Sequence, residues 1–66
     1  MSWAQWHDDV KKVVVEHNVT SARVIERQMD FRYTTAWRDQ LREADREDPK
    51  PRIKEIVRQM GRTPTD

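Results

Sequence analysis

Apolar side chains recur at intervals of three and four residues in the first part of the chain. One helical face collects them: Trp3, Trp6, Val10, Val13, Val14 and His17. Ser2 is a suitable N-cap, because Gln5 three positions later completes a capping box. Asn18 is a suitable end, because Asn tolerates left-handed backbone geometry. The pattern predicts an amphipathic helix over residues 2–17 that leaves Asp9 largely off the apolar face.

A shorter helical pattern follows, capped by Thr20 or Ser21 and running to residue 28 or 29. Its inner face contains Ala22, Ile25 and Met29. Asp30 and Phe31 are then predicted to form a tight turn. Asp accepts left-handed geometry, and Phe31 is expected to fill the turn as an apolar anchor.

A longer helix is predicted from residue 32 or 33 to residue 46. Its expected inner face comprises Tyr33, Ala36, Trp37, Gln40, Leu41 and Ala44. The opposite stripe comprises Thr34, Thr35, Arg38 and Arg42. A polar break over 47–51 follows, where Asp48 can cap a last helix that has Pro49 at its first position. That helix carries the apolar stripe Ile53, Ile56, Val57 and Met60 and ends at Gly61.

These elements predict one all-α domain over residues 1–61, a three- to four-helix bundle with no β wing, and a flexible tail over 62–66. A short helix, a tight turn and a longer helix over 20–46 have the order of a helix-turn-helix. The fourth helix is expected either to pack across the other three or to form a homodimer through its apolar stripe.

Residues 29–38, Met-Asp-Phe-Arg-Tyr-Thr-Thr-Ala-Trp-Arg, resemble the turn and recognition helix of the DNA-reading winged-helix domain of FtsK-type translocases. That family has Gly where Arg32 stands, a basic residue where Thr35 stands, and a β-hairpin wing that this chain lacks. The resemblance therefore implies the helix-turn-helix and DNA contact, without translocation or that family's target site.

If the third helix enters a major groove, its N-terminal residues meet the base edges first. The predicted base-reading residues are Arg32, Thr34, Thr35 and Arg38. The predicted contacts to the DNA backbone are Arg23, Arg27, Arg42, Lys50, Arg52, Lys54 and Arg58. The sequence thus favours sequence-selective binding of duplex DNA through a helix-turn-helix. The protein would be a small regulator, or an accessory factor of recombination or packaging, of the kind that phages and mobile elements carry.

The composition excludes several kinds of catalytic and metal-binding site. The net charge is +1, but basic residues collect near the C-terminal end, where five bases lie between positions 50 and 62 against one acid, Glu55. The chain has no Cys and one Gly, which excludes thiolate metal sites and glycine-rich phosphate loops. His7 and His17 have no ligand partner at helical spacing, and no Ser has a His-and-acid context.

We therefore expect no enzyme, no cofactor, no metal and no small-molecule substrate. The longest apolar run, Val13 to Val15, is too short for a signal peptide or a membrane span. This predicts a protein of the bacterial cytoplasm or nucleoid that does not bind a membrane. The alternative function is a protein-binding module that inhibits or recruits a partner through exposed Trp3 and Trp6 and the C-terminal helix.

Overall fold

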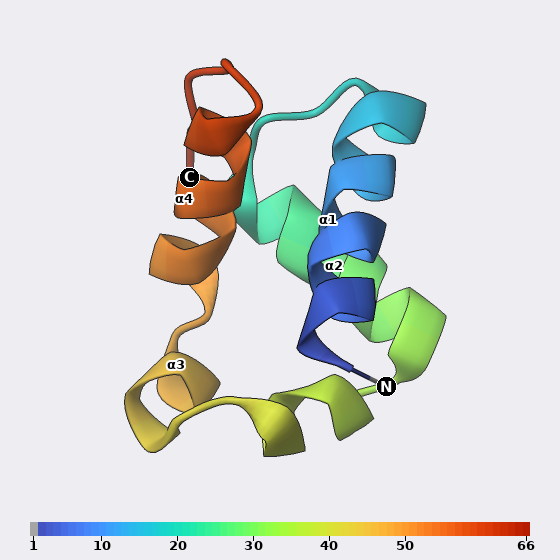
Figure 1. Cartoon of the computed structure of the whole chain (residues 1–66), viewed down its shortest axis with the longest axis vertical. Helices are drawn as coiled ribbons and strands as arrows, with labels where there is room; N and C mark the ends of the chain where they lie inside the picture. The colour runs from blue at the N-terminus through green and yellow to red at the C-terminus, as the bar shows by residue number, and fades with distance from the viewer. Residues whose placement is uncertain (1) are drawn as a thin grey trace.

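The computed structural model describes residues 2–66 and shows four α-helices around one core (Figure 1). They are α1 (Trp3–His17), α2 (Ala22–Tyr33), α3 (Glu43–Glu47) and α4 (Lys50–Gln59). A 3-10 helix, Ala36–Gln40, lies between α2 and α3, and the described residues contain no β-sheet. The predicted all-α class is confirmed. Across residues 2–66, no helix combines the length and the apolar character that crossing a bilayer requires.

Both ends of α1 and the start of α2 follow the predicted capping chemistry. The backbone N–H of Gln5 donates to the hydroxyl of Ser2 at 3.1 Å, and that of Val24 donates to the hydroxyl of Ser21 at 3.3 Å. Asn18 ends α1 in the left-handed conformation, with a φ of 50°. Each cap satisfies a backbone group that the helix leaves without a partner, so local sequence alone fixes where α1 ends and α2 begins.

The predicted third helix over residues 32–46 is wrong, and so is the predicted turn at Asp30 and Phe31. Both residues lie inside α2, which continues to Tyr33. The chain turns at Thr34 instead, where φ is 55° and ψ is −139°. A β-branched residue in this region costs about 1–3 kcal/mol. The next two elements are short, so the helix-turn-helix expected over 20–46 has no recognition helix.

The strained turn at Thr34 allows the connection between α2 and α4 to contribute to the core. The indole N–H of Trp37 donates to Oδ1 of Asp30 at 3.0 Å, and the ring lies 5.7 Å from that of Trp6. Trp37 is fully buried, and Leu41 four residues later is 3% exposed. A continuous helix over 32–46 is thus replaced by a folded connection that covers one end of the α1–α2 pair.

The core draws on every long helix and on this connection. It comprises Trp6, Val10, Val13, Val14, Ala22, Ile25, Met29, Trp37, Leu41, Ile53, Ile56 and Val57. Helices α1, α2 and α4 all contact one another, and the apolar stripe of α4 fills the space between the other two. That stripe is buried within its own chain, which removes the reason for a homodimer through the C-terminal helix.

Asp9 is buried, contrary to its predicted place off the apolar face of α1. It is 5% exposed and accepts a hydrogen bond from the hydroxyl of Tyr33. The Nζ of Lys12 lies 4.0 Å from its other carboxylate oxygen. Because α2 extends to Tyr33, its last turn reaches this side of α1 and covers the carboxylate.

The segment 62–66, expected to be a flexible tail, is held against the start of α2. Gly61, with a φ of 78°, reverses the chain after α4. The N–H of Thr65 then donates to the carbonyl of Thr20 at 2.9 Å, and the N–H of Ala22 donates to the carbonyl of Thr65 at 2.8 Å. We call residues 62–66 the C-terminal strap.

Candidate functional site

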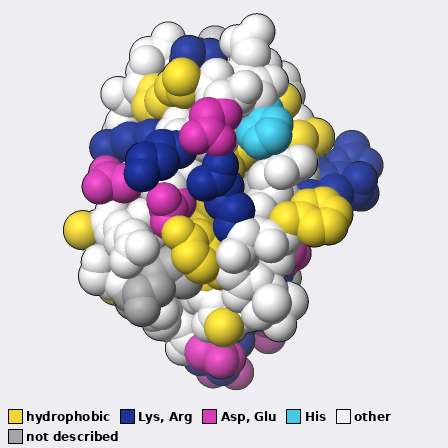
Figure 2. Space-filling view, turned by 90° about the vertical axis from the view of Figure 1, so that its right-hand side faces the viewer, with side chains coloured by type: hydrophobic (Ala, Val, Ile, Leu, Met, Phe, Trp, Pro, Cys, Tyr) yellow, Lys and Arg dark blue, Asp and Glu magenta, His cyan; other side chains and the backbone are white. Residues whose placement is uncertain are grey.

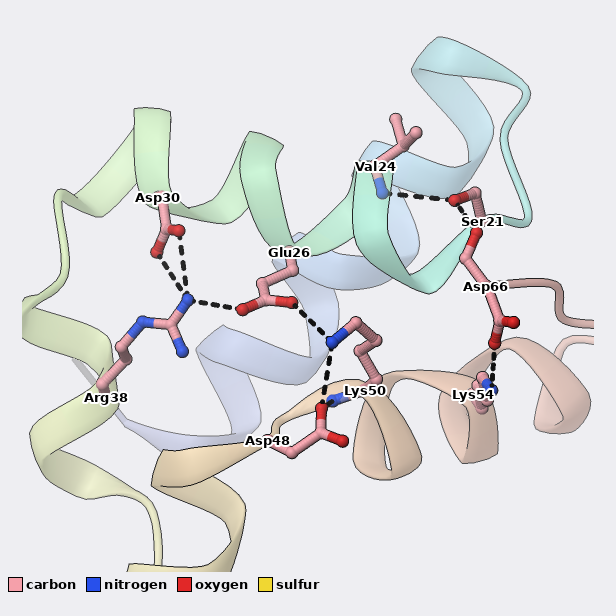
Figure 3. Close-up of polar contacts among 9 residues, drawn as sticks. All are labelled: Ser21, Val24, Glu26, Asp30, Arg38, Asp48, Lys50, Lys54 and Asp66. Atoms are coloured by element: carbon pink, nitrogen blue, oxygen red, sulfur yellow. Dashed lines mark hydrogen bonds and ion pairs between the residues drawn. The ribbon is translucent and has the colours of Figure 1, made fainter.

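Arg38, the central residue of the predicted base-reading set, is engaged within the protein. Its Nη2 lies 2.7 Å from Oε1 of Glu26 and 3.1 Å from Oδ2 of Asp30 (Figure 3). Its guanidinium carbon lies 4.5 Å from the ring centre of Trp37. The side chain is 21% exposed. Arg38 therefore ties the connection to α2 and presents little of its charge to a ligand.

The other predicted base-reading residues do not share a helix face with Arg38. Arg32 lies in the last turn of α2, where its Nη2 is 2.5 Å from Oε2 of Glu16. Thr34 and Thr35 are exposed, but they lie in the connection after α2 rather than on a helix. Without the predicted helix, these four side chains have no common direction in which to enter a groove.

Most of the predicted contacts to the DNA backbone have carboxylate partners in the chain itself. The pairs are Arg42–Asp45 at 3.2 Å, Lys50–Asp48 at 3.3 Å, Arg52–Asp45 at 2.7 Å, Lys54–Asp66 at 2.8 Å and Arg58–Glu55 at 3.4 Å. Arg23 and Arg27 are exposed and have no ion pair within residues 2–66. The basic C-terminal end is therefore largely neutralised, and the predicted DNA-backbone contacts without an ion pair within residues 2–66 lie on α2.

These two arginines share the solvent-facing side of α2 with two apolar residues. Phe31 is 77% exposed and Val24 is 37% exposed. Positions 24, 27 and 31 fall on one side of a helix, because side chains three, four and seven residues apart align. We call Arg23, Val24, Arg27 and Phe31 the α2 outer face. This face was not predicted from the sequence, because Phe31 was expected to fill a turn.

A signal for this face was present in the sequence. Tyr33 follows Met29 at the four-residue spacing that links Ile25 to Met29, so the helical pattern continues through position 31. Once α2 is extended in this way, Phe31 lies seven residues after Val24, on the side opposite the buried residues. The exposed ring follows from the length of the helix.

Charges of both signs interleave on the side of the molecule that Figure 2 draws. Figure 2 shows basic, acidic and hydrophobic side chains alternating on one side of the molecule, with no continuous basic track. Such a surface produces little long-range attraction for a polyanion, because neighbouring opposite charges cancel beyond about 8–10 Å at physiological salt. Local contacts therefore matter more than a general electrostatic field.

A depression of about 410 Å³ lies beside α4 and is lined by His7, Arg42, Asp45, Pro51, Arg52, Glu55, Ile56 and Gln59. Its charged groups are largely matched. Asp45 accepts hydrogen bonds from Arg52 and from Arg42, and its pKa is lowered chiefly by the bond from Arg52. Within residues 2–66, no group of three His, Asp or Glu side chains is arranged to hold a metal ion.

The two N-terminal tryptophans are covered, contrary to their role as exposed anchors in the alternative function. Trp6 is 1% exposed and belongs to the core. Trp3 is half-buried, and the guanidinium carbon of Arg52 lies 4.6 Å from its ring centre. In the apolar stripe of α4, Ile53, Ile56 and Val57 are buried as well, and Met60 is partly buried. A partner therefore has to use other residues.

His7, beside the depression, gives the chain a predicted pH dependence. Burial, and then the charges of Arg52 and Lys11, hold the pKa of His7 below its ordinary value of 6.5. The unfolded chain therefore binds this proton first, so the free energy of unfolding should fall as the pH drops below about 6.5. Urea denaturation at pH 7.5 and pH 5 should show the fall in the wild type and a smaller one in His7→Gln. His17→Gln is the matched control, and an equal fall in all three proteins would contradict this role of His7.

Residues 29–38 are the ones that resemble the turn and recognition helix of FtsK-type translocases in sequence. In the structure these residues form the last turns of α2 and the start of the 3-10 helix, not a turn and a recognition helix. No protein-family model, curated protein or solved structure matches this chain.

Proposed function

We propose that this chain is a docking module that binds an acidic, amphipathic helical segment of another protein on the α2 outer face. One observation carries the proposal: Phe31, 77% exposed, lies on the same face as two arginines that have no carboxylate partner within residues 2–66. Aromatic residues and Arg are the residue types enriched in protein interfaces.

The apolar part of the face supports a protein partner. Burying a Phe side chain contributes about 1.5–3 kcal/mol, and Val24 adds a second contact two turns away. Seven residues of helix span about 10 Å. A partner helix with apolar residues at positions i, i+3 or i+4, and i+7 can therefore contact both side chains by packing its ridges against α2.

The charged part of the face supports an acidic partner. Arg23 and Arg27 are one helical turn apart, and their guanidinium groups suit carboxylates in a two-pronged geometry. Nearby acids on α2 are already engaged, since Glu26 and Asp30 both accept from Arg38. An incoming carboxylate therefore meets two arginines without competition from these two acids.

Duplex DNA is the second candidate. Arg23 and Arg27 were predicted contacts to the DNA backbone, and they are the ones that stay free of ion pairs within residues 2–66. Arg32, Thr34 and Thr35 are exposed at the far end of α2. A duplex bound here would be held through phosphates, so its affinity would show little dependence on sequence and a strong dependence on salt.

Fluorescence anisotropy with two labelled probes tests the proposal. One probe is a helical peptide with Leu at i, i+3 and i+7 and Glu on both flanks, and the other is a random-sequence DNA duplex. We expect the peptide to bind, with Phe31→Ala weakening its affinity at least about tenfold, as for an interface hot spot. Arg27→Ala should weaken it by several-fold, and less at high salt.

Val15→Ala is the matched control, because Val15 is a 61% exposed apolar residue on α1. It should leave the affinity for the peptide unchanged. Binding of the duplex without binding of the peptide would replace the protein partner by DNA. Binding of neither probe would reject both functions.

A further inference from the structure

The C-terminal strap meets α2 at the end where the α2 outer face begins. Ser21 connects the two, since its hydroxyl accepts from the N–H of Val24 and donates to the carbonyl of Asp66 (Figure 3). A parallel bridge between Ser21 and Thr65 places the strap alongside the backbone that leads into α2. The last residues of the strap are thus adjacent to the first turn of the helix.

This contact brings a carboxylate to the basic end of the α2 outer face. Oδ1 of Asp66 lies 2.8 Å from Nζ of Lys54, which projects from α4 (Figure 3). Arg23 lies two residues after Ser21, in the first turn of α2. The hydrogen bond and charge of Lys54 come first in lowering the pKa of Asp66, and the charge of Arg23 adds to them. Asp66 therefore partly offsets the positive charge that Arg23 and Lys54 offer to a partner.

We propose that the strap is a tethered competitor of the partner, in which Asp66 stands in for an acidic side chain that docks beside Arg23 and Lys54. The proposal rests on the proposed function of the α2 outer face and adds its regulation. It also specifies the partner, which must carry a carboxylate at the end that meets the first turn of α2.

The strap is held in a way that allows it to separate from α2. Arg62 is held by two hydrogen bonds, from its N–H to the carbonyl of Val57 and from its guanidinium to Asn18. Beyond it, four hydrogen bonds hold residues 63–66: two between backbones, one from Ser21 and one from Lys54. The strap contributes no residue to the buried core, so its departure opens no cavity. Gly61 precedes it at a φ of 78°, a conformation that glycine enters and leaves without steric cost. The strap can therefore separate while the helices remain packed.

Asp66→Asn tests the competition with the acidic peptide described above. Removal of the competing charge should strengthen binding about threefold at low salt, and hardly at all at 0.5 M salt. Glu47→Gln on α3 is the matched control, because it makes the same change in net charge at an exposed residue with no ion pair within residues 2–66. It should change the affinity by less than Asp66→Asn does.

Thr65→Pro provides a second, independent variant, because it removes the N–H that donates to Thr20. It should also strengthen binding of the peptide. Hydrogen exchange at the amide of Ala22, which donates to Thr65, should speed up in the wild type when the peptide binds.

The outcomes separate the two proposals. If the peptide binds the wild type, Asp66→Asn and Thr65→Pro equally, and the amide of Ala22 stays protected in the complex, the strap does not compete. The proposed function would then stand without this regulation. If the peptide binds none of these proteins, the docking function fails, and the competition fails with it.

Discussion

Replacing Trp37 by Ala should lower the free energy of unfolding by about 3–5 kcal/mol, the usual cost of removing a buried Trp. Trp37 is fully buried, packs against Trp6 and donates to Asp30. Its loss leaves a cavity, an Asp30 carboxylate that lacks one hydrogen bond, and a connection without its main anchor. Thermal denaturation followed by circular dichroism would measure the effect.

Trp37→Phe is the matched control, since it keeps a large ring but removes the indole N–H that donates to Asp30. It should cost less than Trp37→Ala, and the difference separates packing from the hydrogen bond. A Trp37→Ala protein with the melting temperature of the wild type would show that the connection is not part of the cooperative fold.

A chain shortened to residues 1–49 should fail to fold. It loses Ile53, Ile56 and Val57, which are at most 2% exposed. Each buried side chain of this kind contributes about 1.5–3 kcal/mol, which together reaches the total stability expected of so small a domain. The shortened chain should show weak helical circular dichroism and no cooperative melt.

A chain that ends at Gly61 is the control for this truncation. It retains α4 and loses only the strap, whose side chains lie outside the core, so it should fold with a modest loss of stability. Cooperative unfolding of the 1–49 chain at the temperature of the full chain would mean that α4 is not needed by the α1–α2 pair.

Local chemistry made most of α1 and α4 predictable. Ser2 and Asn18 end α1 where their capping properties indicated, and the apolar stripe of α4 is buried as its spacing suggested. Both predictions rest on interactions within a few residues, namely caps and helical periodicity. The break before α4 followed from Asp48 and Pro49, although α4 begins at Lys50, with Pro49 as its N-cap rather than its first residue.

The conformation of residues 34–41 depends on contacts with distant residues, which local sequence patterns do not reveal. Trp37 and Leu41 are spaced like a helix face, yet they belong to a 3-10 helix and the residue after it. Their burial against α1 and α2 outweighs helix formation, and the adjacent β-branched residues Thr34 and Thr35 weaken the helix where it ends. The hydrogen bond from Trp37 to Asp30 needs this fold and cannot be read from spacing.

In the candidate site, too, some features follow from local sequence and others depend on contacts between distant residues. Arg23 and Arg27, which were predicted to contact a ligand, are exposed on the outer side of α2, and the period of the helix alone gives that placement. Some of the other predicted cations are neutralised by near neighbours, such as Arg42 by Asp45, but others pair with residues distant in sequence, as Arg38 does with Glu26 and Lys54 with Asp66. Charge counts along the chain could not reveal which bases remain free.

The strap also has a consequence for the order in which the chain folds. Ser21 and Asp66 are 45 positions apart in the sequence, so their contact closes a loop that contains α2, the connection and α4. The entropy of closing such a loop is too large for a few hydrogen bonds to repay in an unfolded chain. Once α2 and α4 are packed, most of that entropy is already lost, and the same bonds form at little further cost. The strap is therefore expected to form last, as a contact that depends on completion of the fold and contributes nothing to its nucleation.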